Sequence, residues 1–414
     1  MVNVADTTTG VFARFNPPTV PKIGRPEVRV AFGASLRSGD FRISVAGPPA
    51  AGGPFSLSTV VTGAPGFEID QGQYYGVSDF GQIAFKVRSP GVEEIWRGDR
   101  FGGISSIDWD SSGRPVYGPL AINMLGGVAF VKTLPSGESA LMLTDFRAAA
   151  RMVLRTGDPV VGSADRWVPE TMLGGLHGFE PLLNDMNQVA ANGGAGGAPG
   201  FFSPTRDRDI RRARNMVPDA PTSGWVFGNG KIGVRGQVAY SITRADGISR
   251  IELSDGRTAR DRSSGLAPAF DPQQMVIGGI DRNGTVVYYH VAGTAAFAHD
   301  GVTLTRIADT TSPIVPGLIL NRIVHVTINR TGTFSILGNH VSDKSIFVGS
   351  RTVPMRRLFG TGDLLNGSRI RDFRVIDPTY TNASYLGERR GMNHLAFAYA
   401  LENGVEGIEY MEFV

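Results

Sequence analysis

A short pattern of polar and apolar positions recurs along the chain and predicts most of its structure. The clearest copy is Asn123-Met-Leu-Gly126-Gly-Val128-Ala-Phe130, in which a polar turn leads into an apolar strand. Asn, Asp or Ser at the first position can accept hydrogen bonds from the backbone ahead of it, and Gly or Asn at the fourth position tolerates a positive φ. The alternation of Val and Phe around a small residue is typical of a strand. The pattern therefore predicts a tight turn followed by a β-strand.

Seven copies of this phrase can be aligned, and their end points are 45 to 61 residues apart. That period fits a four-stranded propeller blade and is too long for a leucine-rich or ankyrin repeat. The small residue between the two large ones, usually Ala, suits an inner strand of such a blade. We therefore expect an all-β fold, a β-propeller. The seven copies are Ser78–Phe85, Asn123–Phe130, Asn184–Ala191, Gly233–Tyr240, Asp281–Tyr288, Asn329–Ile336 and Arg390–Phe397.

The last copy is followed by one more strand, Ile408-Glu-Tyr410, and the sequence ends at Val414. The outer strands of the last blade must then come from the N-terminal region, where Phe55–Val61 has strand character. Closing the ring in this way removes the open sheet edge that would otherwise pair with other chains.

The number of blades is less sharply defined than the fold. The segment Val28–Phe32 is a candidate eighth copy that lacks the turn residues, so seven blades are favoured and eight are the alternative. The corresponding division is an N-terminal arm with a candidate degenerate first blade at 1–54, and propeller repeats at 55–414. The segment Asp145–Arg155 is the nearest approach to an amphipathic helix, and a loop with a strand fits it equally well.

The repeated phrase resembles that of bacterial tandem-repeat proteins named for an Asn-x-x-Gly-x-x-Ala-Phe repeat. The resemblance covers roughly residues 75–414, in short and degenerate copies. It implies a propeller-like repeat fold and little about activity. Some members of that family end in sorting anchors, and this sequence differs in having neither an anchor nor an export signal.

Composition narrows the class of protein. The chain is 41% hydrophobic and 19% charged, typical of a soluble globular protein, and it has no cysteine, which excludes disulfides and thiolate chemistry. No apolar run is long enough to span a membrane. The net charge of +3 gives no reason to expect nucleic acid. Only five of the 41 basic residues are lysines, which indicates coding bias or, alternatively, arginine-rich subunit contacts.

Two motifs carry a cofactor or metal interpretation. Gly228-Asn-Gly230-Lys-Ile-Gly233 matches the dinucleotide pattern G-x-G-x-x-G, but a strand follows it where that pattern needs a helix, so a turn is favoured. Asp108-Trp-Asp110-Ser-Ser112-Gly113 has the oxygen spacing of the first half of a calcium loop. The acidic residue expected at its twelfth position is replaced by Pro119, so a plain hairpin is favoured.

The other candidates also have structural interpretations. Arg97-Gly98-Asp99 is a cell-adhesion tripeptide that reads better as a Gly-Asp turn. The basic cluster Arg206–Arg214 contains acids and lacks aromatic residues for base stacking, so a solvated loop or subunit contact is favoured. No G-x-S-x-G motif is present, and six histidines are scattered without H-x-x-x-H spacing. They are His177, His290, His299, His325, His340 and His394.

The sequence therefore assigns no catalytic, cofactor-binding or metal-binding residue. We expect a non-catalytic structural or interaction propeller, a subunit of a larger homo-oligomeric assembly such as a bacteriophage tail hub or nozzle, located in the virion. The phage comparison is an analogy at the level of the fold. The alternative is a surface or secreted propeller that binds a glycan or protein, and the third reading is a propeller hydrolase or lyase.

Overall fold

Nearly all regular structure in the computed structural model is β, as the sequence predicts. It describes residues 1–20, 30–47, 55–70, 77–99, 101–112, 117–145, 149–169, 181–207, 210–218, 226–243, 249–263, 275–341, 343–375, 386–389 and 392–414. In these ranges the helical structure is one 3-10 turn, η1 (Thr7–Thr9). The same ranges contain no helix long and apolar enough to cross a membrane.

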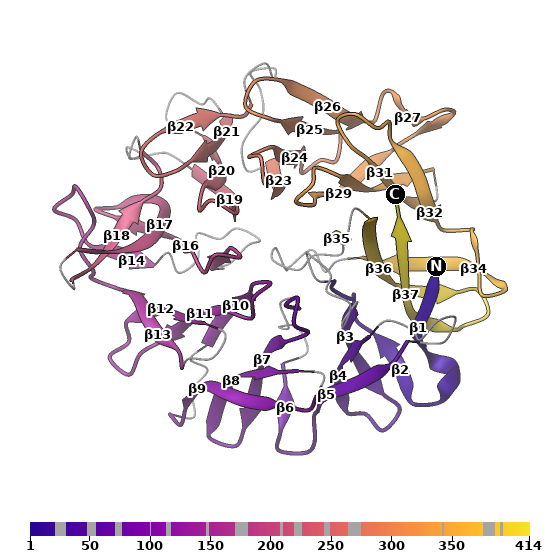
Figure 1. Ribbon diagram of the computed structural model, residues 1–414, viewed down its shortest axis with the longest axis horizontal. Coiled ribbons are helices and arrows are strands. Elements are labelled where there is room, and N and C mark those ends of the chain that lie inside the picture. The colour runs from indigo at the N-terminus through magenta and orange to yellow at the C-terminus, as the bar shows by residue number, and fades with distance from the viewer. Residues whose placement is uncertain are drawn as a thin grey trace. The chain divides into compact units, whose positions relative to one another are not determined.

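The chain forms two compact units, one of residues 1–137, 142–152 and 361–414 and the other of residues 138–141 and 153–360. The first unit holds two four-stranded antiparallel sheets, most of a third and one six-stranded sheet (Figure 1). In sheet order their strands are β2 (Phe12–Phe15), β3 (Val30–Leu36), β4 (Phe41–Ala46) and β5 (Leu57–Thr62); β6 (Glu68–Ile69), β7 (Ile83–Ser89), β8 (Val92–Gly98) and β9 (Ile104–Asp110); β10 (Tyr117–Ile122), β11 (Val128–Thr133), β12 (Ser139–Thr144) and β13 (Arg151–Arg155); and β34 (Ser368–Arg374), β36 (Met392–Leu401), β37 (Glu406–Phe413) and β1 (Val2–Asp6), with β33 (Leu364–Leu365) and β35 (Leu386–Arg389) at the side.

The second unit repeats the same sheet four times and adds a small hairpin. Its strands are β14 (Trp167–Pro169), β16 (Val189–Ala195), β17 (Ala198–Asp207) and β18 (Ile210–Asn215), with β15 (Leu182–Leu183) paired to β16; β19 (Val226–Ile232), β20 (Val238–Thr243), β21 (Ser249–Ser254) and β22 (Ala259–Asp261); β23 (Met275–Ile280), β24 (Val286–His290), β25 (Ala295–His299) and β26 (Leu304–Asp309); β29 (Arg322–Ile328), β30 (Phe334–His340), β31 (Asp343–Gly349) and β32 (Arg356–Gly360); and the hairpin β27 (Pro313–Val315) and β28 (Leu318–Ile319).

These sheets are the blades of a β-propeller, which confirms the predicted fold. The described residues contain eight of them, the alternative that the sequence left open beside seven. The additional blade is β2–β5, whose second strand contains Val30–Phe32, the end of the degenerate copy. Its fourth strand, β5, begins at Leu57, so this blade includes residues from both sides of the predicted boundary at residue 54. Residues 151–155, in the segment for which a short helix was considered, form strand β13.

The turn at the start of the phrase has one recurring geometry in the first six copies; the seventh begins at residues 390–391, outside the described part of the chain. The position-one backbone N–H donates to the position-five carbonyl, and the position-four N–H donates back to the position-one carbonyl, as in Asn123→Gly127 at 2.9 Å and Gly126→Asn123 at 3.1 Å. The position-one side chain accepts from the N–H groups of positions three and five. For Asn123 these are Leu125 at 3.1 Å and Gly127 at 2.8 Å. Ser78, Asn184, Asp281 and Asn329 make the same pair of bonds.

The fourth position explains the glycines of the phrase. Gly126 has φ 83° and Asn187, at the same place in its copy, has φ 58°. Glycine adopts this left-handed conformation without steric cost, and asparagine tolerates it better than most residues. The predicted role of both turn positions is therefore confirmed.

The apolar half of the phrase forms the second strand of its blade, which has a hydrogen-bonded neighbour on each side. Val128, Ala129 and Phe130 are all fully buried, on both faces of β11. Neighbouring blades pack through such residues; one cluster joins Ala31 and Ile43 of the β2–β5 blade to Phe85 of the β6–β9 blade. Burial on both faces explains why the strand segment is continuously apolar.

The last blade is completed by a strand from the N-terminal region, as predicted, but from a different segment. β1 pairs antiparallel with β37, and Figure 1 shows the two strands side by side. Phe55–Val61, the predicted closing segment, instead contributes to β5 in the β2–β5 blade. Gly407 allows the close approach of β1, because a Cβ there would lie 2.6 Å from the carbonyl oxygen of Ala5.

A buried carboxyl group lies in this closing blade. Glu409 on β37 stands opposite Asn3 of β1 and Phe397 of β36 and is 1% exposed. Its Oε2 atom has no hydrogen-bond partner in the described part of the chain. Burial raises the pKa of Glu409 to about 7, because the charged carboxylate is poorly solvated there.

Asn123→Ala is expected to lower the free energy of unfolding by about 1–3 kcal/mol, because the buried Gly127 N–H and the half-buried Leu125 N–H lose their acceptor. Asn123→Asp keeps an acceptor oxygen, as Asp281 does in its own copy, and is expected to cost less than about 1 kcal/mol. Urea unfolding of both variants checks this. Equal losses for Ala and Asp would contradict the role given to the side-chain oxygen.

Glu409→Gln is expected to stabilise the protein at pH 8 and to leave it unchanged at pH 4. The folded state holds the Glu409 proton up to about pH 7, whereas the unfolded chain releases it near the ordinary value of 4.5. The free energy of unfolding therefore falls as pH rises through this window, by up to about 3 kcal/mol. Thermal unfolding across pH measures the effect, with exposed Glu402→Gln as control. A gain that does not depend on pH would argue against this origin.

Candidate functional site

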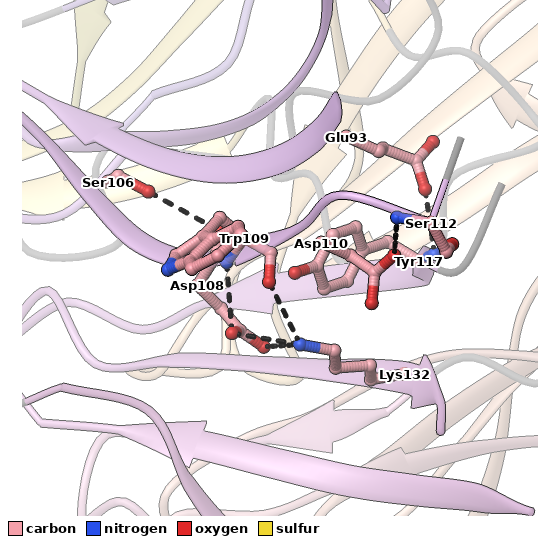
Figure 2. Close-up of polar contacts among 8 residues, drawn as sticks. All are labelled: Glu93, Ser106, Asp108, Trp109, Asp110, Ser112, Tyr117 and Lys132. Carbon is pink, nitrogen blue, oxygen red and sulfur yellow. Dashed lines mark hydrogen bonds and ion pairs between the residues drawn. The ribbon is translucent and has the colours of Figure 1, made fainter. Parts of the chain in front are cut away.

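Polar and aromatic side chains gather where β9 ends and β10 begins. We call this group the Trp109 cluster; Figure 2 shows it, and it consists of Glu93, Ser106, Asp108, Trp109, Asp110, Ser112, Tyr117 and Lys132. The strand registers bring it together: Asp110 of β9 stands opposite Glu93 of β8, and Tyr117 of β10 stands opposite Lys132 of β11. The cluster therefore joins two consecutive blades.

Lys132 is the central cation of the cluster. Its Nζ atom lies 3.0 Å from both carboxylate oxygens of Asp108 and donates to the carbonyl oxygen of Trp109 at 3.2 Å. The ammonium group also lies 5.2 Å from the centre of the Tyr117 ring, a cation–π distance. Lys132 is thus fully engaged and fixes the end of β9 against the next blade.

The exposed part of the cluster combines an indole with an ionised carboxylate. The Trp109 side chain is 61% exposed, although it belongs to a strand. Hydrogen bonds from the side chain and backbone of Ser112 lower the pKa of the neighbouring Asp110, whose Oδ1 lies 2.8 Å from the Ser112 nitrogen. An exposed aromatic face suits a cationic or amphipathic side chain of a ligand.

Beneath this surface lies a buried ionic network. Glu93 accepts from the backbone N–H of Tyr117 at 3.0 Å and pairs with Arg88 at 2.9 Å. Lys86, 2% exposed, lies 3.1 Å from Asp70 and donates to the carbonyl oxygen of Tyr117 at 3.4 Å. Tyr117, the first residue of β10, is therefore held through both its backbone N–H and its carbonyl oxygen.

Tyr117 remains a neutral phenol over the physiological range. Burial raises its pKa, and the carboxylates of Asp108 and Asp110 raise it further because they disfavour a neighbouring phenolate. The ring therefore serves as an apolar wall and as a support for Lys132. It does not supply a base.

The calcium interpretation of residues 108–113 is not supported by this geometry. Asp108 and Asp110 both lie in strand β9, and the Asp108 carboxylate binds Lys132. Within the described ranges, no group of three or more acidic or histidine side chains is placed to hold a metal ion. Gly113, the last residue of the motif, lies outside those ranges.

The other sequence candidates occupy structural positions. Arg97 is buried and donates to the carbonyl oxygens of Gly126 and Asp145, both at 3.0 Å. Asp99 caps the following turn by accepting from the N–H of Phe101 and Gly103, so the tripeptide forms a strand end and a turn.

Two further motifs lie in strands. Gly228–Ile232 belongs to β19 and is followed by a turn and β20, so it does not open a helix as the dinucleotide pattern requires. The basic cluster lies in the antiparallel strands β17 and β18, where we expected a loop; Arg208 and Asp209 lie outside the described residues. Arg211 of this cluster pairs with Asp158 at 3.4 Å.

One histidine makes the contact that a nucleophile and its base would make. His340 Nε2 lies 2.9 Å from Ser345 Oγ, and Arg357 Nε donates to the same oxygen at 2.9 Å. Ser345 is fully buried, so a substrate cannot reach it. The pair is therefore a structural contact between β30 and β31. His290, His299, His325 and His394 also lie on strands, and His177 is outside the described residues.

Sequence reasoning found Asp108 and Asp110 but missed Trp109, Tyr117 and Lys132. A usable signal was present: lysine is rare in this chain, and two of its five lysines, Lys86 and Lys132, form ion pairs in these two blades.

The sequence matches no protein-family model, and no curated protein is significantly similar to it. Its fold, however, is similar to that of solved peptidases. Prolyl oligopeptidase B from Galerina marginata, bound to a 35mer hydrolysis and macrocyclization substrate, is 10% identical with a TM-score of 0.50 over 97% of this chain and 55% of that one. Oligopeptidase B from Leishmania major is 8% identical, with a TM-score of 0.47 over 96% and 55%.

A puromycin-hydrolyzing peptidase from Mycobacterium tuberculosis is 12% identical, with a TM-score of 0.47 over 97% of this chain and 62% of its own. The chain thus spans about half the length of the peptidases that it matches. At these identities the likeness establishes the propeller fold.

These comparisons contradict the function predicted from the sequence. A non-catalytic structural subunit of an assembly such as a phage tail hub or nozzle was expected, whereas the solved structure matched with a TM-score of 0.50 is a peptidase. The absence of a catalytic motif was read as a structural role, and that inference was wrong. Because the match covers about half of each peptidase, the comparison itself assigns no activity to this chain.

Lys132→Met is expected to lower the free energy of unfolding by about 2 kcal/mol, because Asp108 keeps its charge in a largely buried place without its partner. Asp108→Asn in the Lys132→Met background is expected to recover part of this loss. A double-mutant cycle by urea unfolding measures the coupling of the pair. A coupling near zero would mean that the contact does not fix the two blades.

Proposed function

We propose that the chain is the peptide-binding propeller of a peptidase-type hydrolase. The observation that carries the proposal is the match of 97% of this chain to part of a prolyl oligopeptidase B bound to a 35-residue peptide substrate. A propeller supplies a rigid scaffold whose strand ends and turns present side chains to a ligand. The role of this chain is to bind the peptide, and the hydrolytic groups come from the peptidase with which it works.

The Trp109 cluster supports the peptide part of this proposal. Its exposed indole offers an apolar, cation-attracting face, and Asp110, the next residue of the strand, stays ionised. Both groups are held on a strand whose end is fixed by the Asp108–Lys132 pair. A rigid aromatic anchor is typical of sites that bind flexible peptides at low entropic cost.

The test is binding of unstructured peptides to the purified chain, followed by fluorescence anisotropy. We expect measurable binding that weakens about tenfold in Trp109→Ala. Phe101→Ala is the matched control, because Phe101 is an exposed aromatic at the other end of β9. If peptides of varied composition fail to bind the folded wild-type chain, the proposal is wrong.

A second measurement addresses the hydrolase part. Depleting the chain from extracts of its source cells is expected to lower peptide cleavage, measured by mass spectrometry. Adding back wild-type protein is expected to restore cleavage, and adding back Trp109→Ala only partly. An unchanged cleavage rate after complete depletion would mean that this chain takes no part in peptide hydrolysis.

A further inference from the structure

Four turns of the repeated phrase contact one another within residues 153–360. They are residues 184–187, 233–236, 281–284 and 329–332. The Asn184 side chain donates to the carbonyl oxygens of Gly233 at 2.9 Å and Val234 at 3.1 Å, which joins the first turn to the second.

The remaining contacts close the group. The Arg282 N–H donates to the Arg330 carbonyl oxygen at 3.3 Å, joining the third turn to the fourth. Arg330 Nη1 lies 3.7 Å from Asp185 Oδ2, which joins the fourth turn back to the first. The second turn is thus linked to the first, the first to the fourth and the fourth to the third, so the turns of four consecutive blades form one connected group.

Three of the eight second and third positions of these turns are arginines. Arg282 and Arg330 occupy the second position of their copies and Arg235 the third, whereas Asp185 is the acid at the second position of the first turn. Asp185 pairs with Arg330. Arg235 and Arg282 are exposed, and neither side chain has an ion-pair or hydrogen-bond partner in the described part of the chain.

Asp281 is a second acid at these turns, so three arginines stand against two acids. Asp281 is 4% exposed, and its Oδ1 accepts from the N–H groups of Asn283 and Thr285, so it is committed to the turn. Neighbouring like charges create a positive potential at the surface, and a guanidinium presents paired donors that match a carboxylate. The group is therefore suited to an anionic ligand.

We propose that Arg235, Arg282 and Arg330 form a binding site for a carboxylate of the peptide, either its C-terminal carboxylate or an acidic side chain. This inference rests on the proposed function for the peptide as ligand. The backbone bonds of the turns already fix the main chain that carries the arginines. Binding therefore has to order only their side chains, which costs less entropy than ordering a flexible loop as well.

The experiment uses one unstructured, labelled peptide in four forms, with a free or amidated C-terminus and with Glu or Gln at one internal position. We expect the forms that carry the preferred carboxylate to bind roughly tenfold more tightly than the neutral form, with the preference shrinking as salt rises. Comparing the two single-carboxylate forms identifies its source.

The double variant Arg235→Gln/Arg282→Gln is expected to bind all four forms with the affinity of the neutral form. Arg257→Gln/Arg260→Gln is the matched control, because both are exposed arginines at or beside the edge strand β22 and their loss removes the same two charges. A folded double variant that keeps the carboxylate preference, or a wild type that shows none, would overturn the inference. If the double variant is unstable, the two single variants replace it.

The experiment also distinguishes a failure of the proposed function from a failure of the carboxylate site. If no peptide binds the wild type, the proposed function is wrong, and sodium succinate becomes the probe. We then expect succinate to raise the unfolding temperature of the wild type above that in sodium chloride of equal ionic strength, and not that of the double variant. No difference between the two proteins would overturn the carboxylate site as well.

Discussion

A short side chain that accepts two backbone hydrogen bonds is the constraint on which most copies of the repeated turn depend. In five copies of the phrase the oxygen of Ser, Asn or Asp binds the N–H groups two and four residues ahead. The turn brings these N–H groups to one oxygen atom, and an N–H left without an acceptor there would cost stability. A longer side chain could not fold back onto its own turn, and an apolar one could not accept. Five of the seven copies therefore keep a side-chain acceptor at position one, whereas the second and third positions vary.

The copy at Gly233 shows how the structure tolerates the loss of this side chain. Gly233 keeps the backbone bonds of the turn: its N–H donates to the Gln237 carbonyl oxygen at 2.7 Å, and its carbonyl oxygen accepts from the Gly236 N–H at 3.0 Å. The same carbonyl oxygen accepts from the Asn184 side chain of the preceding blade at 2.9 Å. This bond anchors the turn to its neighbour but does not supply the acceptor that the position-one side chain provides elsewhere. The backbone bonds and the neighbouring turn therefore hold this copy without a position-one side chain.

Local features could be predicted from the sequence because their cause is local. The positive φ of Gly126 and the acceptor role of Asn123 depend on residues within five positions, and the sequence contains all of them. The closing strand depends on pairing across the whole chain. Leu57–Thr62 and Val2–Asp6 both have strand character, and only the distant strand β37 selects between them. The degenerate blade β2–β5 was ambiguous for the same reason, because its turn residues are missing.

The candidate site was the part of the structure least accessible to prediction, because its contacts join residues of different blades. Asp108 and Lys132 are 24 positions apart and belong to different blades, so no spacing rule joins them. Their meeting depends on how one blade packs on the next, which a repeat phrase does not encode.

The same reasoning applies to the arginines at the second and third turn positions, which the phrase leaves unconstrained. A scaffold whose turns are fixed by backbone and position-one bonds can change these residues at little cost in stability. Asp185 and Arg330 occupy equivalent positions in two copies yet carry opposite charges and pair with each other. Function in such a fold is therefore best sought where equivalent positions differ, because the shared residues are already explained by folding.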